Sequence, residues 1–165
     1  MTGGSFHSAT LRRVLGDYPT GVCVVTAVEA EAGPSGMVVS SFTSVSLDPP
    51  LVAFFPDKLS SSWKRIEAAR RFCVNILSAD QQALCRQFAA RGGYKFEGVI
   101  HRVSPNGSPV LEGVVAWIDC DLYAVHEAGD HDIAVGLVKD LAIETACNPL
   151  LFFQGRFGEF AERIR

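Results

Sequence analysis

The last third of the chain contains two long β-rich stretches, Val114 to Glu127 and His131 to Glu144, separated only by Ala128-Gly129-Asp130. A short glycine-containing connection between two such stretches predicts an antiparallel hairpin. Further segments have the β-branched or apolar character of strands. They are Gly21 to Val28 (apolar enough to be buried on both faces), Gly36 to Ser46, Leu51 to Phe55, Arg71 to Leu77 and Leu150 to Phe153.

Helices are few and lie between or before these strands. Helical spacing of apolar residues predicts one over Phe6 to Asp17. Serines at the start and basic residues at the end predict another over Ser60 to Arg71, and a Ser-x-x-Gln capping pattern opens a third, from Ser78 to about Ala90. Residues 91–106 are rich in glycine and charge and are expected to form a loop. This balance favours a closed antiparallel barrel with peripheral helices over a doubly wound sheet.

Size and charge exclude several classes of protein. We expect residues 1–165 to form a single domain. The net charge of −3 lacks the basic excess of a dedicated nucleic-acid binder. No apolar stretch approaches the ~20 residues of a membrane span, and Met1 to Ser8 lacks the pattern of a signal peptide. The five cysteines form no CxxC pair and have no histidine at zinc-ligand spacing, so we expect no metal site and a cytoplasmic location.

Several motifs of nucleotide binding and catalysis are absent from the sequence. It has no Gly-x-Gly-x-x-Gly opening a helix, no Walker A loop, no Gly-x-Ser-x-Gly elbow and no His-Glu-x-x-His. If the protein is an enzyme, we therefore expect a cofactor to supply its reactive chemistry. That cofactor would be bound by a site different from those that these motifs form.

The segment Gly36 to Pro50, GMVVSSFTSVSLDPP, places many hydroxyl side chains in a strand otherwise made of Val, Phe and Leu. Each hydroxyl needs a hydrogen-bond partner when it is buried. A strand that lines a polar ligand provides such partners, and so does an edge strand whose serines and threonines face water. The residues alone leave these two interpretations even.

The ordered motifs of the chain resemble those of the flavin reductase-like family. They run from about Leu11 to Phe157 and comprise PTGV, SFTSVSLDPP, a serine-rich helix start, FCVNILS, QxxLCRQFA, KF, GDH and PLLFF. The resemblance implies a mainly β, antiparallel, Greek-key-like split β-barrel with a few peripheral helices. It also implies a homodimer that holds flavin by main-chain and hydroxyl contacts near the subunit interface.

The resemblance also assigns roles to particular residues. It implies that a run of residues lies beside the flavin ring and ribityl chain: Ser40, Ser41, Phe42, Thr43 and Ser44. Donors there would stabilise the negative charge that develops when the ring accepts hydride.

Lys58, Ser61 and Ser62 lie at the start of the predicted second helix and are expected to bind the flavin phosphate. Lys95 and Phe96 match the family's Lys-Phe pair, and the resemblance implies that they reach the phosphate or adenosine end of the flavin. A helix N-terminus binds phosphate through free N–H groups, and a lysine adds a point charge. Ordinary helix capping would explain one of the serines, and an exposed loop position would explain Lys95.

His131 follows Gly129 and Asp130 in the turn of the predicted hairpin. A turn needs the glycine and the aspartate for its geometry, but it does not need a histidine. The resemblance implies that His131 projects toward the nicotinamide or flavin pocket, where an imidazole orients NAD(P)H or handles a proton near neutral pH. A solvent-exposed turn histidine is the alternative.

The resulting hypothesis is a flavin reductase that passes hydride from NADH or NADPH to FMN or FAD and supplies reduced flavin to a separate monooxygenase. The sequence does not choose between the two flavins or between the two nicotinamides. Alternatives are a non-catalytic flavin carrier, an oxidase of a phosphorylated pyridoxine-type substrate, and a plain structural dimer.

Overall fold

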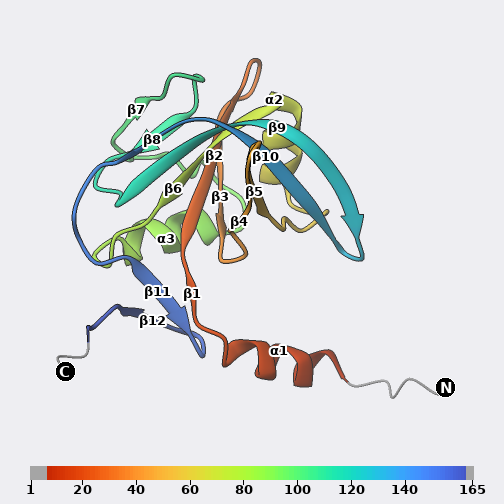
Figure 1. Ribbon diagram of the computed structural model, residues 1–165, viewed down its shortest axis with the longest axis vertical. Helices are drawn as coiled ribbons and strands as arrows, with labels where there is room; N and C mark the ends of the chain where they lie inside the picture. The colour runs from red at the N-terminus through yellow and green to blue at the C-terminus, as the bar shows by residue number, and fades with distance from the viewer. Residues whose placement is uncertain (1–6, 163–165) are drawn as a thin grey trace.

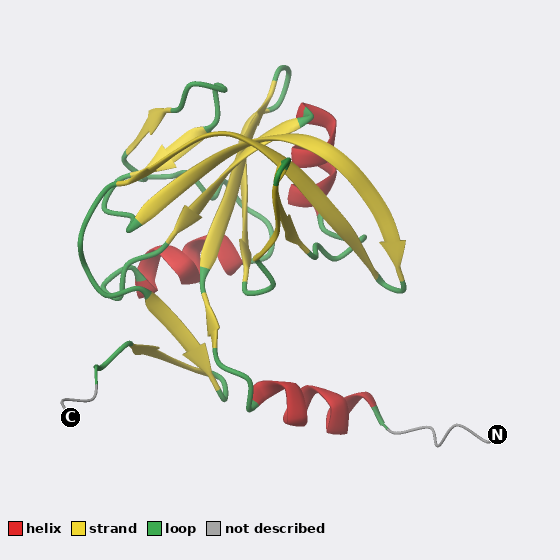
Figure 2. Ribbon diagram, in the orientation of Figure 1, coloured by secondary structure: helices red, strands yellow, loops and turns green. Residues whose placement is uncertain are grey.

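The computed structural model describes residues 7–162, which form mainly antiparallel strands with three helices (Figures 1 and 2). Phe6, the first residue of the predicted N-terminal helix, lies outside the described residues. The first half of the chain comprises α1 (Ser8–Gly16), β1 (Thr20–Gly21), β2 (Cys23–Glu29), β3 (Gly33–Val39), β4 (Thr43–Leu47), β5 (Pro50–Phe54), α2 (Ser61–Ala69) and β6 (Arg71–Ile76). The second half comprises α3 (Gln82–Ala89), β7 (His101–Val103), β8 (Pro109–Leu111), β9 (Ala116–Ala128), β10 (His131–Ile143), β11 (Leu150–Phe153) and β12 (Arg156–Glu159).

A seven-stranded antiparallel sheet in the order β3-β2-β6-β9-β10-β5-β4 forms the body of the protein. The predicted hairpin is confirmed as β9 and β10, in which Ala128 pairs with His131 and Gly129 has the positive φ of +68° that the turn requires. Register shifts on either side of Leu137 increase the twist of these long strands, which curve around the body in Figure 1.

The connection between β3 and β4 shows why the sheet must curl. These two strands are the opposite edges of the sheet, yet only residues 40–42 separate them. Edges of a flat seven-stranded sheet would lie about 29 Å apart, whereas the four Cα steps from Val39 to Thr43 span at most about 14 Å. The sheet therefore closes into a barrel at this point. The predicted continuous strand from Gly36 to Ser46 is wrong, because residues 40–42 leave one edge to reach the other.

Two apolar clusters lie on the two faces of this sheet. Under α2, Trp63 and Ile66 pack with Phe54 and Phe72 of the strands. Under α3, Phe88 packs with Phe96 and with residues of β8. Alternating residues of β2 enter each cluster, which confirms the prediction of a strand buried on both faces.

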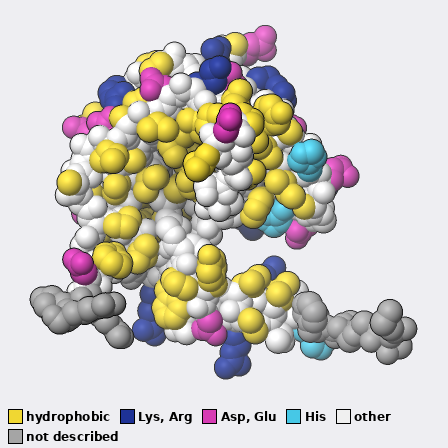
Figure 3. Space-filling model, in the orientation of Figure 1, with side chains coloured by type: hydrophobic (Ala, Val, Ile, Leu, Met, Phe, Trp, Pro, Cys, Tyr) yellow, Lys and Arg dark blue, Asp and Glu magenta, His cyan; other side chains and the backbone are white. Residues whose placement is uncertain are grey.

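A smaller unit extends from the barrel and comprises α1 and the three-stranded sheet β1-β11-β12 (Figure 1). No residue of α1 is buried, and Leu11, Val14 and Leu15 expose their apolar side chains. Figure 3 shows hydrophobic side chains on the surface of this smaller unit. The predicted loop over residues 91–106 is wrong in one part, because His101–Val103 pairs with β8. Within residues 7–162 no helix has the length and apolar character needed to cross a membrane.

Candidate functional site

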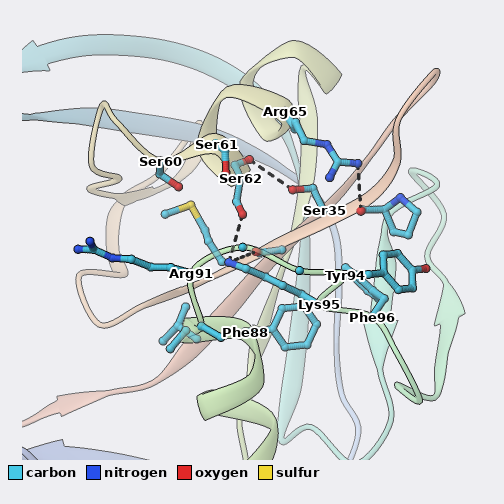
Figure 4. A pocket seen from close by; sticks show the side chains of 18 of the residues that line it. Ser35, Ser60, Ser61, Ser62, Arg65, Phe88, Arg91, Tyr94, Lys95 and Phe96 are labelled. Carbon is cyan, nitrogen blue, oxygen red and sulfur yellow. Dashed lines mark hydrogen bonds between the residues drawn. The ribbon is translucent and has the colours of Figure 1, made fainter.

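A pocket of about 710 Å³ opens between β3, the start of α2 and the segment after α3 (Figure 4). Its wall includes three residues predicted from the sequence to contact a phosphate, Ser61, Ser62 and Lys95. Phe96 also lines it and is buried, with its ring edge-on to Phe88 at a centroid distance of 5.0 Å. The structure thus brings together two pairs of neighbouring residues that lie more than thirty positions apart in the chain.

Lys95 contributes positive charge to the wall of this pocket, which Arg65 and Arg91 also line. Its Nζ donates to Ser62 Oγ at 3.3 Å and to the Gly36 carbonyl at 3.4 Å, as Figure 4 shows for Ser62. Among the described residues no carboxylate lies within ion-pair distance of Lys95. Burial lowers the pKa of this ammonium because desolvation disfavours its charged form. An anion in the pocket would relieve that cost.

The N-terminus of α2 forms the opposite wall. Ser60 is the N-cap, and its hydroxyl accepts from the Trp63 N–H at 3.2 Å. Capping therefore uses the serine that precedes the helix and leaves Ser61 and Ser62 for the pocket. The first turn also carries the positive end of the helix dipole, which favours an anion.

Lys58 lies apart from this pocket, although the sequence predicts it at the phosphate. Its Nζ is 3.7 Å from Glu127 Oε1 and 4.0 Å from Asp132 Oδ1, and its N–H donates to the Asp130 carbonyl at 3.1 Å. These contacts attach the segment after β5 to the tip of the β9–β10 hairpin. A role for Lys58 at a phosphate remains a prediction.

A second pocket of about 610 Å³ adjoins the first, and the two share Met37, Val38 and Asp57 in their walls. Ser40 and Ser41 line it from the β3–β4 connection, and His131 lines it from the start of β10. The Ser41 hydroxyl accepts from the Phe55 N–H at 2.9 Å, which fixes this connection to the end of β5.

His131 reaches the second pocket with its ring 45% exposed. Its Nδ1 is 2.7 Å from Asp130 Oδ1, and the hydrogen bond and charge of the imidazole lower the pKa of that carboxyl. Because Nδ1 is engaged by the carboxylate, Nε2 is the nitrogen free to face a ligand.

The remaining residues of the run predicted to lie beside the flavin ring are outside both pockets. Phe42 packs against the apolar cluster under α2. Thr43 and Ser44 are exposed on the edge strand β4, where they pair with Ala53 and Val52. Binding roles for these three residues remain predictions.

Several pocket residues were not predicted from the sequence. Met37, Val38, Phe55 and Ile133 supply apolar wall, and their pattern is indistinguishable from that of core strands. Asp57 follows a strand end, a position that often carries function, and this signal was present in the sequence. Across residues 7–162 no cluster of three or more metal-ligating side chains occurs.

Residues 15–161, nearly the whole described chain, match the flavin reductase like domain family. The chain belongs to that family. The family prediction made from the ordered motifs is therefore confirmed.

Curated relatives and solved structures agree with this flavin reductase like domain. A flavin reductase of Pseudomonas putida is 57% identical over 91% of this chain and 88% of its own length. The reductase subunit HsaB of a flavin-dependent monooxygenase from Rhodococcus jostii is 44% identical over 88% of this chain and 74% of its own. The structure of Streptomyces globisporus NADH:FAD oxidoreductase SgcE6 with NAD and FAD fragments superimposes with a TM-score of 0.87 at 40% identity, covering 93% of this chain and 92% of that one.

Proposed function

We propose that this chain is an NAD(P)H-dependent flavin reductase that supplies reduced flavin to a separate monooxygenase. The observation that carries the proposal is the pair of adjoining pockets. One holds a lysine without an acidic partner among the described residues at a helix N-terminus, and the other holds hydroxyls, an imidazole and apolar walls. A flavin mononucleotide has the matching polarity, with a phosphate at one end and a flat heteroaromatic ring at the other.

The phosphate end is assigned to the first pocket. Lys95 contributes a charge, Ser61 and Ser62 contribute hydroxyls, and α2 contributes its dipole. The buried Phe96 keeps the lysine in place, because its ring packs edge-on against Phe88 of α3. Lys95 is partly buried and has no carboxylate partner among the described residues, which supports this assignment, since a partly desolvated ammonium gains from a nearby anion.

The ring end is assigned to the second pocket, where Ser40 and Ser41 lie beside the apolar Met37 and Ile133. Flavin, when bound, supplies the redox chemistry by accepting a hydride from the nicotinamide. The hydroxyl and backbone donors of this wall favour negative charge on the ligand, and the apolar side chains exclude water around it. His131 is assigned to orient the nicotinamide or to hold a proton at Nε2.

The same proposal covers the organisation of the protein. We assign residues 1–165 to a single domain, since the described strands form one barrel and two smaller sheets, β1-β11-β12 and β7-β8. We propose that a second copy of the chain packs against the exposed apolar face of α1. The five cysteines are free thiols, which supports a reducing, cytoplasmic location.

The test is a direct assay of the purified protein. Nicotinamide absorbance is followed with NADH and with NADPH, each with FMN and with FAD. We expect flavin-dependent oxidation of at least one nicotinamide, with reduced flavin released to solution. Stoichiometric flavin retention without turnover would instead identify a carrier, and oxidation that needs no flavin would refute the assignment.

A further inference from the structure

The proposed reaction needs a constant distance and orientation between two parts of the protein that lie on different elements. One is the N-terminus of α2 at the first pocket, and the other is His131 at the second. His131 forms the last pair of the β9–β10 ladder, opposite Ala128. Strand ends beside a turn open more easily than strand centres, so the ladder alone holds this position weakly.

Asp132, the next residue, provides a stronger attachment. Its Oδ2 accepts from the Trp63 Nε1–H at 2.9 Å, and its side chain is only 13% exposed. Its N–H donates to the Pro56 carbonyl at 2.9 Å. A direct hydrogen bond from the buried indole to this largely buried side chain is short and directional, so it holds the side chain in one orientation.

The indole at the other end of this bond does not move easily. Trp63 is 1% exposed and lies edge-on to Phe54 at a centroid distance of 5.7 Å. It is the third residue of α2 and directly follows Ser61 and Ser62 in the wall of the first pocket. The bond therefore runs from the barrel core beside one pocket to the strand end beside the other.

The alternation of side chains along β10 means that the attachment of Asp132 also sets the direction of the His131 side chain. Successive side chains of a strand point to opposite faces, so anchoring Asp132 toward α2 directs His131 to the other side. His131 also forms a bridge with Asp57, a residue that lines both pockets.

We propose that Asp132 is a positioning residue: through Trp63 it holds His131 in a fixed relation to the N-terminus of α2. This inference rests on the proposed function. Asp132 lines neither pocket, so its effect reaches the ligand only through His131 and the segment after β5.

Amide hydrogen exchange in the flavin-free protein tests the link without any activity. The Lys58 N–H bonds to the Asp130 carbonyl, and the amide at position 132 bonds to the Pro56 carbonyl, so both report on the hairpin tip. In Asp132→Ala we expect their protection to fall by at least about tenfold, while amides in the centre of β2 keep theirs. Trp63→Phe, which keeps an aromatic ring on Phe54 but removes the donor, should give the same local loss.

Kinetics then separate positioning from stability. We expect Asp132→Ala to lower kcat/KM for NADH by at least about tenfold, because small misplacements of a reacting group are costly. The dissociation constant for FMN should change by no more than about threefold, since the α2 wall stays in place. The double variant with Trp63→Phe should lose no more than the worse single variant, as expected of two residues in one interaction.

Two matched variants complete the design. Asp132→Asn still offers an oxygen to the indole, and Lys58 still has Glu127, so it should retain the amide protection and most of the activity. Asp121→Ala removes a carboxylate of β9 that is ion-paired with Lys139 at 3.8 Å, away from both pockets, and should change neither readout.

Retained protection at the tip in Asp132→Ala, or lost protection with unchanged kcat/KM, would overturn the inference. So would an Asp132→Asn variant as impaired as Asp132→Ala, because charge rather than the indole bond would then be responsible. Failure of the proposed function has a different signature, in which the unaltered protein itself oxidises no nicotinamide with any flavin.

Discussion

The Lys95 ammonium lies 3.3 Å from the hydroxyl of Ser62. This contact joins the segment after α3 to the first turn of α2 across the mouth of the larger pocket.

Replacing Lys95 with methionine should weaken flavin binding far more than it slows turnover at saturating flavin. A charge-assisted hydrogen bond contributes about 1.5–3 kcal/mol, which corresponds to roughly a tenfold to hundredfold rise in the dissociation constant for FMN. Flavin fluorescence quenching measures that constant. Lys64→Met removes an equal charge from an exposed position of α2 and should leave it unchanged. Equal losses in both variants would argue for a general charge effect.

The affinity for FMN should fall with rising pH earlier than an ordinary lysine would cause. Burial lowers the pKa of Lys95 from its usual 10.5, and only the protonated form attracts phosphate. Affinity is therefore full below the pKa of the flavin-free protein and declines above it, by at most about tenfold per pH unit. Titration of the dissociation constant between about pH 7 and pH 10 checks this. Lys95→Arg should show no such decline, because arginine stays charged.

Replacing Gly36 with alanine should destabilise the protein. A Cβ at this position would lie 2.5 Å from Cε1 of Phe88, a buried ring held by Phe96. Overpacking of this kind costs about 1–3 kcal/mol, which lowers the Tm by roughly 2–4 °C for each kcal/mol in a chain of this size. Gly21→Ala, where no atom lies within 4 Å of the added Cβ, is the matched control and should keep its Tm. An unchanged Tm in Gly36→Ala would contradict the close packing of α3 on β3.

Replacing His131 with alanine should lower kcat by at least about tenfold while changing FMN affinity little. The imidazole lines the second pocket, whereas the residues proposed to contact the phosphate line the first. Stopped-flow measurement of flavin reduction separates the two effects. His126→Ala removes an exposed imidazole from the neighbouring strand and should be neutral. A His131→Ala enzyme with normal kcat would remove His131 from the proposed mechanism.

Thiol labelling should distinguish one cysteine from the other four. Burial raises the pKa of Cys23 and of Cys120 to about 12 and also raises that of Cys73 and Cys85, whereas Cys147 is exposed. Thiol forms react slowly with disulfide reagents because the thiolate is the nucleophile. We expect one fast equivalent in the native protein, its loss in Cys147→Ser, and five equivalents after denaturation. Several fast equivalents in the native protein would show that the barrel opens readily.

Much of the fold was predictable because its signals are local. The hairpin from Val114 to Glu144 combines alternating β-rich residues with a glycine turn, and both signals act within a few residues. The break at residues 40–42 has no such signal, because Ser40, Ser41 and Phe42 include neither glycine nor proline, the residues that mark a break most strongly. The sheet edges that β3 and β4 form depend on the strands with which each of them pairs, β2 and β5.

In the candidate site, too, features with local sequence signals were predictable, and features that depend on distant contacts were not. A serine-rich helix start and a lysine-phenylalanine pair were recognisable, and the structure places them around one pocket. Lys58 carries the same charge as Lys95, but its contacts with Glu127 and Asp132 arise from the hairpin tip and leave no trace in the neighbouring sequence. Met37 and Ile133 escape prediction because an apolar wall of a pocket is made from the same residues as a core.

The three-residue connection between β3 and β4 has one more consequence. Residues 40–42 join the two edges of the barrel, and two of them, Ser40 and Ser41, also form part of the wall of the second pocket. The shortness of this segment therefore holds the two sheet edges close together and also limits the width of the second pocket. An insertion here would let the edges separate and would widen the pocket, whereas an insertion in the turn between β2 and β3 would do neither. Relatives that bind bulkier ligands with this fold are expected to differ in the length of this connection.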